Sequence, residues 1–169
     1  MTTCMYTTSI PVLQQMLGSL DAILAKAEKH VAEKKIEPTA LTQLRLFPDM
    51  FPLSRQVQIA CYFARSIGTE LTGAELPKFD QSADTFAGMH ALIAHTLNAI
   101  AALTPAQFDG SETREVAVHA GTPHEAHYNG EKYLLHYAMP QFIFHVTTVY
   151  ALLRHAGLDI GKRDFVGTF

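Results

Sequence analysis

The stretch that decides the fold is Ala138-Met-Pro-Gln-Phe-Ile-Phe-His-Val-Thr-Thr-Val-Tyr-Ala-Leu-Leu-Arg-His-Ala-Gly157. It is apolar on almost every side of a helix, and one ionisable side chain, His145, stands in its middle. At about 100° per residue, Phe142 and Val146 lie on one face while Phe144 projects from the opposite face. A helix that is apolar on two faces needs more than one neighbour. A buried imidazole also needs a hydrogen-bond partner.

Three further segments repeat apolar residues every three or four positions, which predicts helices with one buried stripe. Ser9 and Pro11 mark the start of the first, Ser82 or Asp84 is a candidate N-cap for the third, and Gly73 ends the second. A short helical piece is expected around Thr39–Leu46, and the last helix should start near Asn129 or Gly130, bend at Pro140 and end at Gly157. The predicted long helices span 10–31, 53–71 and 86–100.

Between the third helix and the last one the period of the pattern changes to two. Glu115-Val-Ala-Val-His, a Gly121-Thr-Pro turn and Glu125-Ala-His-Tyr-Asn-Gly predict a small β-hairpin. No Pro-, Gly- or Ser-rich linker divides the 169 residues, so we expect one domain over 1–169. The predicted fold is all-α, a four-helix bundle with a small β-hairpin inserted before the last helix.

Composition argues against several classes of partner. The formal charge is -3, the isoelectric point is near 6.3, and the basic residues are scattered, so nucleic acid is not expected to bind. No window approaches the roughly 18 apolar residues of a membrane span, and nothing resembles a signal peptide, so we expect a cytoplasmic protein without a membrane partner. Cys4 and Cys61 lie far apart and should be reduced, with Cys61 a small core residue.

The two apolar faces of the last helix suggest a subunit interface. In a bundle of four, no helix is central, so one of the two faces lacks a neighbour within the chain. We therefore predict a homodimer that packs partly through the last helix. The alternative is that the tail from Leu158 to Phe169 folds back and covers the outer face.

Three runs in this order resemble a bacterial family. They are Pro48-Asp-Met-Phe-Pro-Leu-Ser-Arg-Gln-Val-Gln-Ile-Ala, the run from Tyr133 to His155, and Gly161-Lys-Arg-Asp-Phe-Val-Gly. They are similar to the signatures of the domain-of-unknown-function family numbered nineteen ninety-three, over essentially the whole chain. That resemblance implies a place in the DinB-like superfamily of four-helix bundles, which includes metal-dependent enzymes and thiol S-transferases.

The resemblance also implies a metal site, from which this chain departs. Superfamily members with a metal typically use a His on the second helix and a His-x3-His pair on the last one. His145 matches the first position of that pair, but Val149 follows where the second imidazole should stand. The second helix has no His, and its Gln56 and Gln58 are amides that bind zinc or nickel weakly. We therefore expect no metal cofactor, with a divalent metal such as zinc or nickel at His145 as the alternative.

His145 remains the leading candidate residue, with two readings open. It is either a neutral buried imidazole whose hydrogen bond to the second helix fixes the register of the bundle, or a ligand-binding or acid–base group. A polar cavity ringed by Arg55, Gln58, Tyr62 and His145 would favour the second reading. Arg55 and Gln58, at i and i+3, could share a face and hold a carboxylate or amide.

Spacing argues against a metal at the other histidines. His90 and His95 do not share a helix face, and His119, His124 and His127 fall in the hairpin without a fourth ligand. In the tail, Lys162, Arg163 and Asp164 either tie the C-terminal segment to the bundle or overhang a pocket. Gly-rich phosphate loops, nucleophile elbows and paired carboxylates on a buried helix face are missing from the sequence.

Two functional hypotheses remain. The first is a metal-free dimeric bundle with a small-ligand-binding or structural role, in which His145, Arg55, Gln58 and Tyr62 line a site between helices. The second is a divalent-metal-dependent enzyme of the thiol S-transferase type that uses His145.

Overall fold

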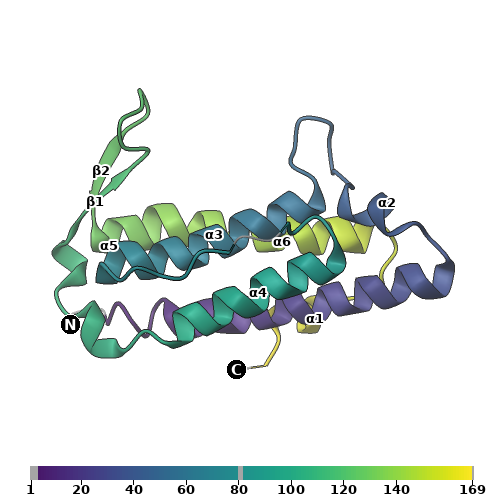
Figure 1. The fold of residues 1–169 in the computed structure, drawn as a ribbon, viewed down its shortest axis with the longest axis horizontal. Coiled ribbons are helices and arrows are strands. Elements are labelled where there is room, and N and C mark those ends of the chain that lie inside the picture. Colours follow the sequence, from purple (N-terminus) through teal and green to yellow (C-terminus); the bar gives the residue numbers. More distant parts are fainter. Residues whose placement is uncertain (1–3, 80–81, 169) are drawn as a thin grey trace.

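The computed structural model describes residues 4–79 and 82–168. Its long helices fill the segments that the apolar periodicity predicts (Figure 1). The helices are α1 (Ile10–Lys34), α2 (Pro38–Thr42), α3 (Leu53–Thr72), α4 (Phe86–Ala101), α5 (Gly130–Lys132), α6 (Met139–His155) and α7 (Lys162–Val166), and the strands are β1 (Glu115–Val118) and β2 (Ala126–Asn129). Short 3-10 turns lie at Pro105–Phe108 and Ser111–Thr113.

Four of these helices form a bundle of two layers. In Figure 1, α3 and α6 make the upper layer, and α1 and α4 make the lower one. The main contacts run from α1 to α4, from α4 to α3 and from α3 to α6, and α6 returns to α1. The space between them is filled by one continuous apolar cluster that all four helices supply. The predicted all-α bundle with a hairpin before the last helix is confirmed.

The predicted cap of α1 is right in position but makes no side-chain capping bond, and the predicted cap of α4 is wrong. Ser9 precedes α1, but its hydroxyl donates to the Met5 carbonyl oxygen at 2.6 Å, because the chain already turns before the helix begins. At α4, Thr85 is the cap in place of Ser82 or Asp84, and its hydroxyl oxygen accepts from the backbone N–H of Gly88 at 3.0 Å.

The last helix begins at the predicted place but is irregular before Pro140. Asn129 caps α5 by accepting from the Lys132 N–H at 2.9 Å. The segment Tyr133–Ala138 is then a π-helix, which leads into α6. Pro140 has no N–H to offer the carbonyl four residues earlier, and its ring crowds that carbonyl, so a widened turn at this point accommodates both effects.

The hairpin projects from one end of the bundle. Its strands are antiparallel, and Val116 faces Tyr128 in the register. Val116 and Val118 are buried while their neighbours Glu115 and Ala117 are exposed, as the alternating pattern predicts. On the same side of the bundle, the connection between α2 and α3 forms a second projection (Figure 1).

The tail folds back, but mainly onto α1. The side chain of Gln15 donates to the Val166 carbonyl oxygen at 2.8 Å, and Lys26 pairs with Asp164. Phe165 also meets the Tyr150 ring edge-to-face. On the outer side of α6, Ile143 is 42% exposed and Phe144 is 55% exposed. The tail therefore covers only part of the second apolar face.

The length and hydropathy of the helices bear on whether one of them could span a membrane. Within the described residues, no single helix is long and apolar enough to cross a bilayer. One sharply bent pair, α4 with Pro105–Thr113, reaches the required length and hydropathy when its two parts are taken together.

The start of the last helix packs so closely that only glycine fits. A Cβ at Gly130 would lie 1.9 Å from the backbone oxygen of Ser111, whereas one at Gly18 would meet nothing within 4 Å. We expect Gly130→Ala to lower the free energy of unfolding by more than about 2 kcal/mol, because backbone must move. Gly18→Ala, the matched control within α1, should raise it by up to about 1 kcal/mol. Urea denaturation measures both, and equal effects would contradict the packing described.

Candidate functional site

The side chain of His145 is joined to α3 by a buried hydrogen bond. Its Nδ1 lies 2.6 Å from Oε1 of Gln56, and both residues are buried. The amide N–H of Gln56 donates in turn to the Phe51 carbonyl oxygen at 3.1 Å. Because that bond uses the amide nitrogen as donor, the amide oxygen must accept, and Nδ1 carries the imidazole proton. The two hydrogen bonds, from His145 on α6 to Gln56 on α3 and from Gln56 to the loop before α3, are therefore consistent with one assignment of donors and acceptors.

Aromatic rings enclose this imidazole. Phe63 stacks on it with ring centroids 6.2 Å apart, and Phe144 meets it edge-to-face at 5.2 Å. Burial lowers the pKa of His145, since the enclosure disfavours the charged ring. The residue is thus a neutral imidazole at neutral pH, as the first of the two sequence interpretations requires.

The donor set around His145 does not fit the metal site that the fold family implies. Val149 lies one turn further along α6 and offers no lone pair, and the contact from α3 is the amide of Gln56. That amide oxygen is already committed to the Nδ1 proton. Within the described part of the chain, no group of three His, Cys, Asp or Glu side chains is placed to hold a metal ion. One imidazole and one amide are a weak set for zinc or nickel.

The cysteines add no nucleophile to this region. Cys61 is buried in α3, and burial raises the pKa of its thiol to about 12. The thiolate is the reactive form, so this thiol is inert at neutral pH. Cys4 is exposed and lies before α1, outside the α3–α6 seam.

Arg55 and Gln58 do share a face of α3, as their spacing predicts. Nη1 of Arg55 donates to Oε1 of Gln58 at 2.9 Å, and the guanidinium lies 5.9 Å from the centre of the Phe51 ring. Tyr62 is 62% exposed. These residues lie on the outer surface of α3, whereas His145 is turned inward toward Gln56.

The four predicted residues are not brought together around one cavity. Gln58 and Tyr62 line a pocket of about 540 Å³ between α3, the start of α4 and the connection that joins them. Arg55 and His145 are not among its lining residues. The pocket is lined by Gln58, Tyr62, Arg65, Lys78, Phe79, Ser82, Ala83, Asp84 and Leu92.

Arg65 is the residue that sequence reasoning missed. Its Nη2 donates to the carbonyl oxygens of Leu76 and Pro77, while Nη1 is buried without a hydrogen-bond partner among the described residues. Burial lowers the pKa of Arg65, but the guanidinium stays charged at neutral pH. The signal was present, because Gln58, Tyr62 and Arg65 stand at i, i+4 and i+7, which is one face of a helix.

Asp84, the acidic residue among the described lining, already accepts hydrogen bonds from within the protein. Asp84 accepts from the side chain of Gln58 at 3.1 Å and from the Ser82 hydroxyl at 3.0 Å. Among the described lining residues, Arg65 and Lys78 are the cations and Asp84 is the carboxylate, and each of its two oxygens accepts a hydrogen bond. The described lining therefore carries more positive than negative charge, together with a guanidinium donor that has no partner in the described chain.

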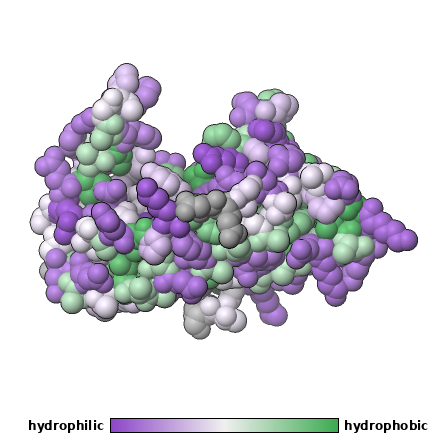
Figure 2. All heavy atoms as spheres, in the orientation of Figure 1, coloured by the Kyte–Doolittle hydropathy of each residue, from purple (hydrophilic) through white to green (hydrophobic). Residues whose placement is uncertain are grey.

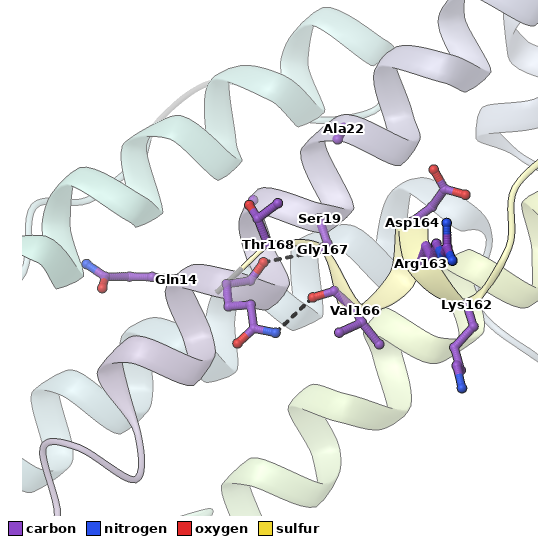
Figure 3. A pocket seen from close by; sticks show the side chains of 11 residues that line it. Gln14, Ser19, Ala22, Lys162, Arg163, Asp164, Val166, Gly167 and Thr168 are labelled. Atoms are coloured by element: carbon purple, nitrogen blue, oxygen red, sulfur yellow. Dashed lines mark hydrogen bonds between the residues drawn. The ribbon is translucent and has the colours of Figure 1, made fainter.

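A larger hollow of about 800 Å³ lies between α1 and the tail. Figure 3 shows Gln14 and Ser19 extending from α1, with Lys162 and Arg163 on α7 and the bond from Gln15 to Val166 between the two segments. Gly167 approaches Ser19 so closely that a Cβ would lie 2.1 Å from its hydroxyl oxygen. The tail is therefore tied to the bundle, as one sequence interpretation held, and it also forms a pocket wall.

Comparison with known proteins finds a family and a solved structure that each match nearly the whole chain. The family model described as "Domain of unknown function (DUF1993)" matches residues 5–166. A crystal structure of a DinB family member protein from Shewanella denitrificans matches with a TM-score of 0.88 and 34% sequence identity, over 97% of this chain and 92% of that one. No curated protein matches significantly.

The lowered pKa of His145 makes stability depend on pH. The folded state resists protonation while an unfolded histidine binds a proton near its ordinary pKa of 6.5. The unfolded state therefore holds more protons below that pH, and the free energy of unfolding should fall as pH drops from neutral toward mildly acidic values. His145→Gln should flatten this fall, whereas His155→Gln, an exposed control, should leave it unchanged. Denaturation at a series of pH values is the measurement, and identical slopes in wild type and His145→Gln would contradict the assignment.

Proposed function

The chain belongs to the DUF1993 family, and from that premise we propose that it binds a small organic acid in the pocket between α3 and α4 and forms a homodimer through α6. The observation that carries the ligand proposal is the buried Nη1 of Arg65, which has no hydrogen-bond partner among the described residues. A buried charged donor is costly to leave unpaired. Nη1 itself has almost no accessible surface, so a carboxylate in the pocket would pair with the Arg65 guanidinium after a small rotation that turns Nη1 toward it.

The other lining residues support the same class of ligand. Lys78 adds a second positive charge, and Tyr62 and Ser82 add hydroxyl groups. Phe79 and Leu92 supply apolar surface for the body of a ligand. A volume of about 540 Å³ lies within the range of small-molecule sites. In this proposal His145 does not touch the ligand, and its bond to Gln56 holds α3 in register with α6.

Benzoate is a suitable first probe, because it pairs a carboxylate with an apolar ring. We expect saturable binding by wild type in calorimetric titration and none by benzyl alcohol, which has the same ring without the charge. Loss of one charge-assisted hydrogen bond should weaken binding by about tenfold or more. Lys78→Met and Arg65→Lys should each show such a loss, the latter because a single ammonium cannot replace the guanidinium fork.

Lys29→Met, on the exposed side of α1, is the matched control for removal of a positive charge. Equal weakening by this variant would indicate a nonspecific charge effect. If neither benzoate nor a panel of aliphatic carboxylates binds wild type, the ligand proposal is wrong.

The dimer proposal is supported by the distribution of exposed apolar side chains. Those of Leu46, Phe47, Phe51, Tyr62, Ile143 and Phe144 are all exposed and belong to α3, α6 or the connection before α3. Phe63 contacts the rings of both Tyr62 and His145, and Phe144 contacts His145, so α3 and α6 contribute to the same surface. Clustered exposed apolar groups are typical of subunit interfaces.

The shape of this side of the molecule is consistent with a partner. In Figure 2 the outline dips between the hairpin and the α2–α3 connection, which both project from the same side as the α3–α6 layer in Figure 1. A second copy packed against the outer side of α6 would cover Phe144 and Ile143, and Phe144 in turn contacts the His145 ring. Two-fold symmetry would place the same residues opposite each other.

Phe144→Glu tests the dimer directly. We expect wild type to sediment as a dimer at micromolar concentration and Phe144→Glu as a folded monomer, because two carboxylates would be buried across the axis. Ile36→Glu, at an exposed apolar position beyond the end of α1, should remain dimeric. A monomeric wild type at this concentration would overturn the proposal.

A further inference from the structure

A second cavity, distinct in chemistry from the acid-binding pocket, lies where the hairpin meets α3 and the π-helical segment. It measures about 80 Å³ and is lined largely by hydroxyl, carboxyl and imidazole groups. Of the pocket residues described above, it shares only Tyr62. The groups that matter are Ser66 and Glu70 from α3, His119 from the end of β1, and Tyr133 and Tyr137 from the last helix.

The π-helical segment carries both tyrosines of this cavity. Residues four apart lie on the same side of a helix, so the Tyr133 and Tyr137 side chains are neighbours. The Tyr133 and Tyr137 rings are accordingly near-parallel, 29° apart in plane, with centroids separated by 5.9 Å. Both phenols therefore border the same small cavity.

Each phenol is held by one partner. The Tyr133 hydroxyl lies 2.8 Å from the Ser66 hydroxyl, and the Tyr137 hydroxyl lies 3.0 Å from Nε2 of His119. His119 takes a left-handed backbone with φ of 53°, which is uncommon outside glycine, where the chain leaves β1. The hairpin thereby closes the cavity on the side away from α3. Burial raises the pKa of both tyrosines, so both phenols stay protonated and uncharged.

Glu70 is the charged group without a counterpart. It is half-buried in the cavity wall, and among the described residues it makes no salt bridge or side-chain hydrogen bond. Burial raises its pKa, which is the response of a carboxyl that lacks a nearby cation. No lysine or arginine is among the described lining residues. The cavity thus combines a carboxylate, phenol oxygens and aromatic rings.

A carboxylate, phenol oxygens and aromatic rings around one cavity favour a positively charged ligand. Aromatic faces and a carboxylate attract a desolvated ammonium or guanidinium group, and hydroxyl oxygens accept its N–H bonds. One water takes about 30 Å³ of liquid volume, so the cavity holds a group of only a few heavy atoms. We propose that this cavity binds a small organic cation of the guanidinium or alkylammonium type, with Glu70 as its counter-ion and the Tyr133–Ser66 and Tyr137–His119 pairs as acceptors. This proposal does not depend on the acid-binding pocket or on the dimer.

Guanidinium and urea are a matched pair of probes, because they are planar, similar in size and differ in charge. Wild-type protein is titrated with millimolar guanidinium chloride at constant ionic strength, and the NMR signals of Tyr133, Tyr137 and the Ser66 amide are followed. We expect saturable shifts with guanidinium, a similar response to methylammonium, and none with urea. Glu70→Gln should weaken guanidinium binding by about tenfold or more.

Two controls make the result specific. Glu131→Gln removes an exposed carboxylate on α5 and should bind guanidinium as wild type does, and Lys78→Met should do the same if the two sites are separate. Tyr137→Phe keeps the ring but removes an acceptor, so it should weaken binding less than Glu70→Gln. The proposal is overturned if wild type shows no saturable response, if urea binds equally, or if a folded Glu70→Gln binds as tightly as wild type.

Discussion

The hydrogen bond from His145 to Gln56 is the constraint on which the arrangement of α3 and α6 depends. Apolar stripes alone allow two helices to slide by a turn at modest cost, because one aliphatic contact replaces another. A buried polar pair permits no such exchange, since a shift would leave the imidazole N–H or the amide oxygen without a partner. The same amide holds the Phe51 carbonyl, so the connection before α3 is fixed by the same register. The register of α3 against α6 therefore also sets where the α3 side chains that line the two pockets lie.

Much of the fold could be predicted from the sequence, because its signals are periodic. The apolar repeat located α1, α3, α4 and the last helix, and the alternation of Val116 and Val118 located the hairpin. Tertiary contacts decided the finer points. Ser9 was free to cap α1, yet the turn before it offered its hydroxyl a nearer acceptor, the Met5 carbonyl oxygen. Periodicity also could not reveal the π-helix, which depends on how the carbonyls before Pro140 are accommodated.

The candidate site was predictable only in part. His145 stood out because a polar group within an apolar helix needs a partner, and Gln56 occupies the position on α3 that faces it. The pocket could not be foreseen, because one of its walls is the long connection before α4, whose path leaves no periodic trace. That wall brings Lys78 and Phe79 beside Gln58 and Tyr62. The same connection also holds Arg65 in the pocket, because the guanidinium donates to the carbonyl oxygens of Leu76 and Pro77.

The π-helical segment has a consequence for how chains of this fold can differ in length. A π turn is an α-helix that has accommodated one extra residue, while the helix on either side keeps its phase. Between Tyr133 and Ala138 the chain can therefore lose that residue without rotating α6, so the face that carries His145 stays directed at α3. The cost would fall on the stacked tyrosines and on Leu134 and Ala138, which are buried in the same segment. The direction of α6 can thus be kept while the chemistry beneath the hairpin changes, although both belong to one continuous helix.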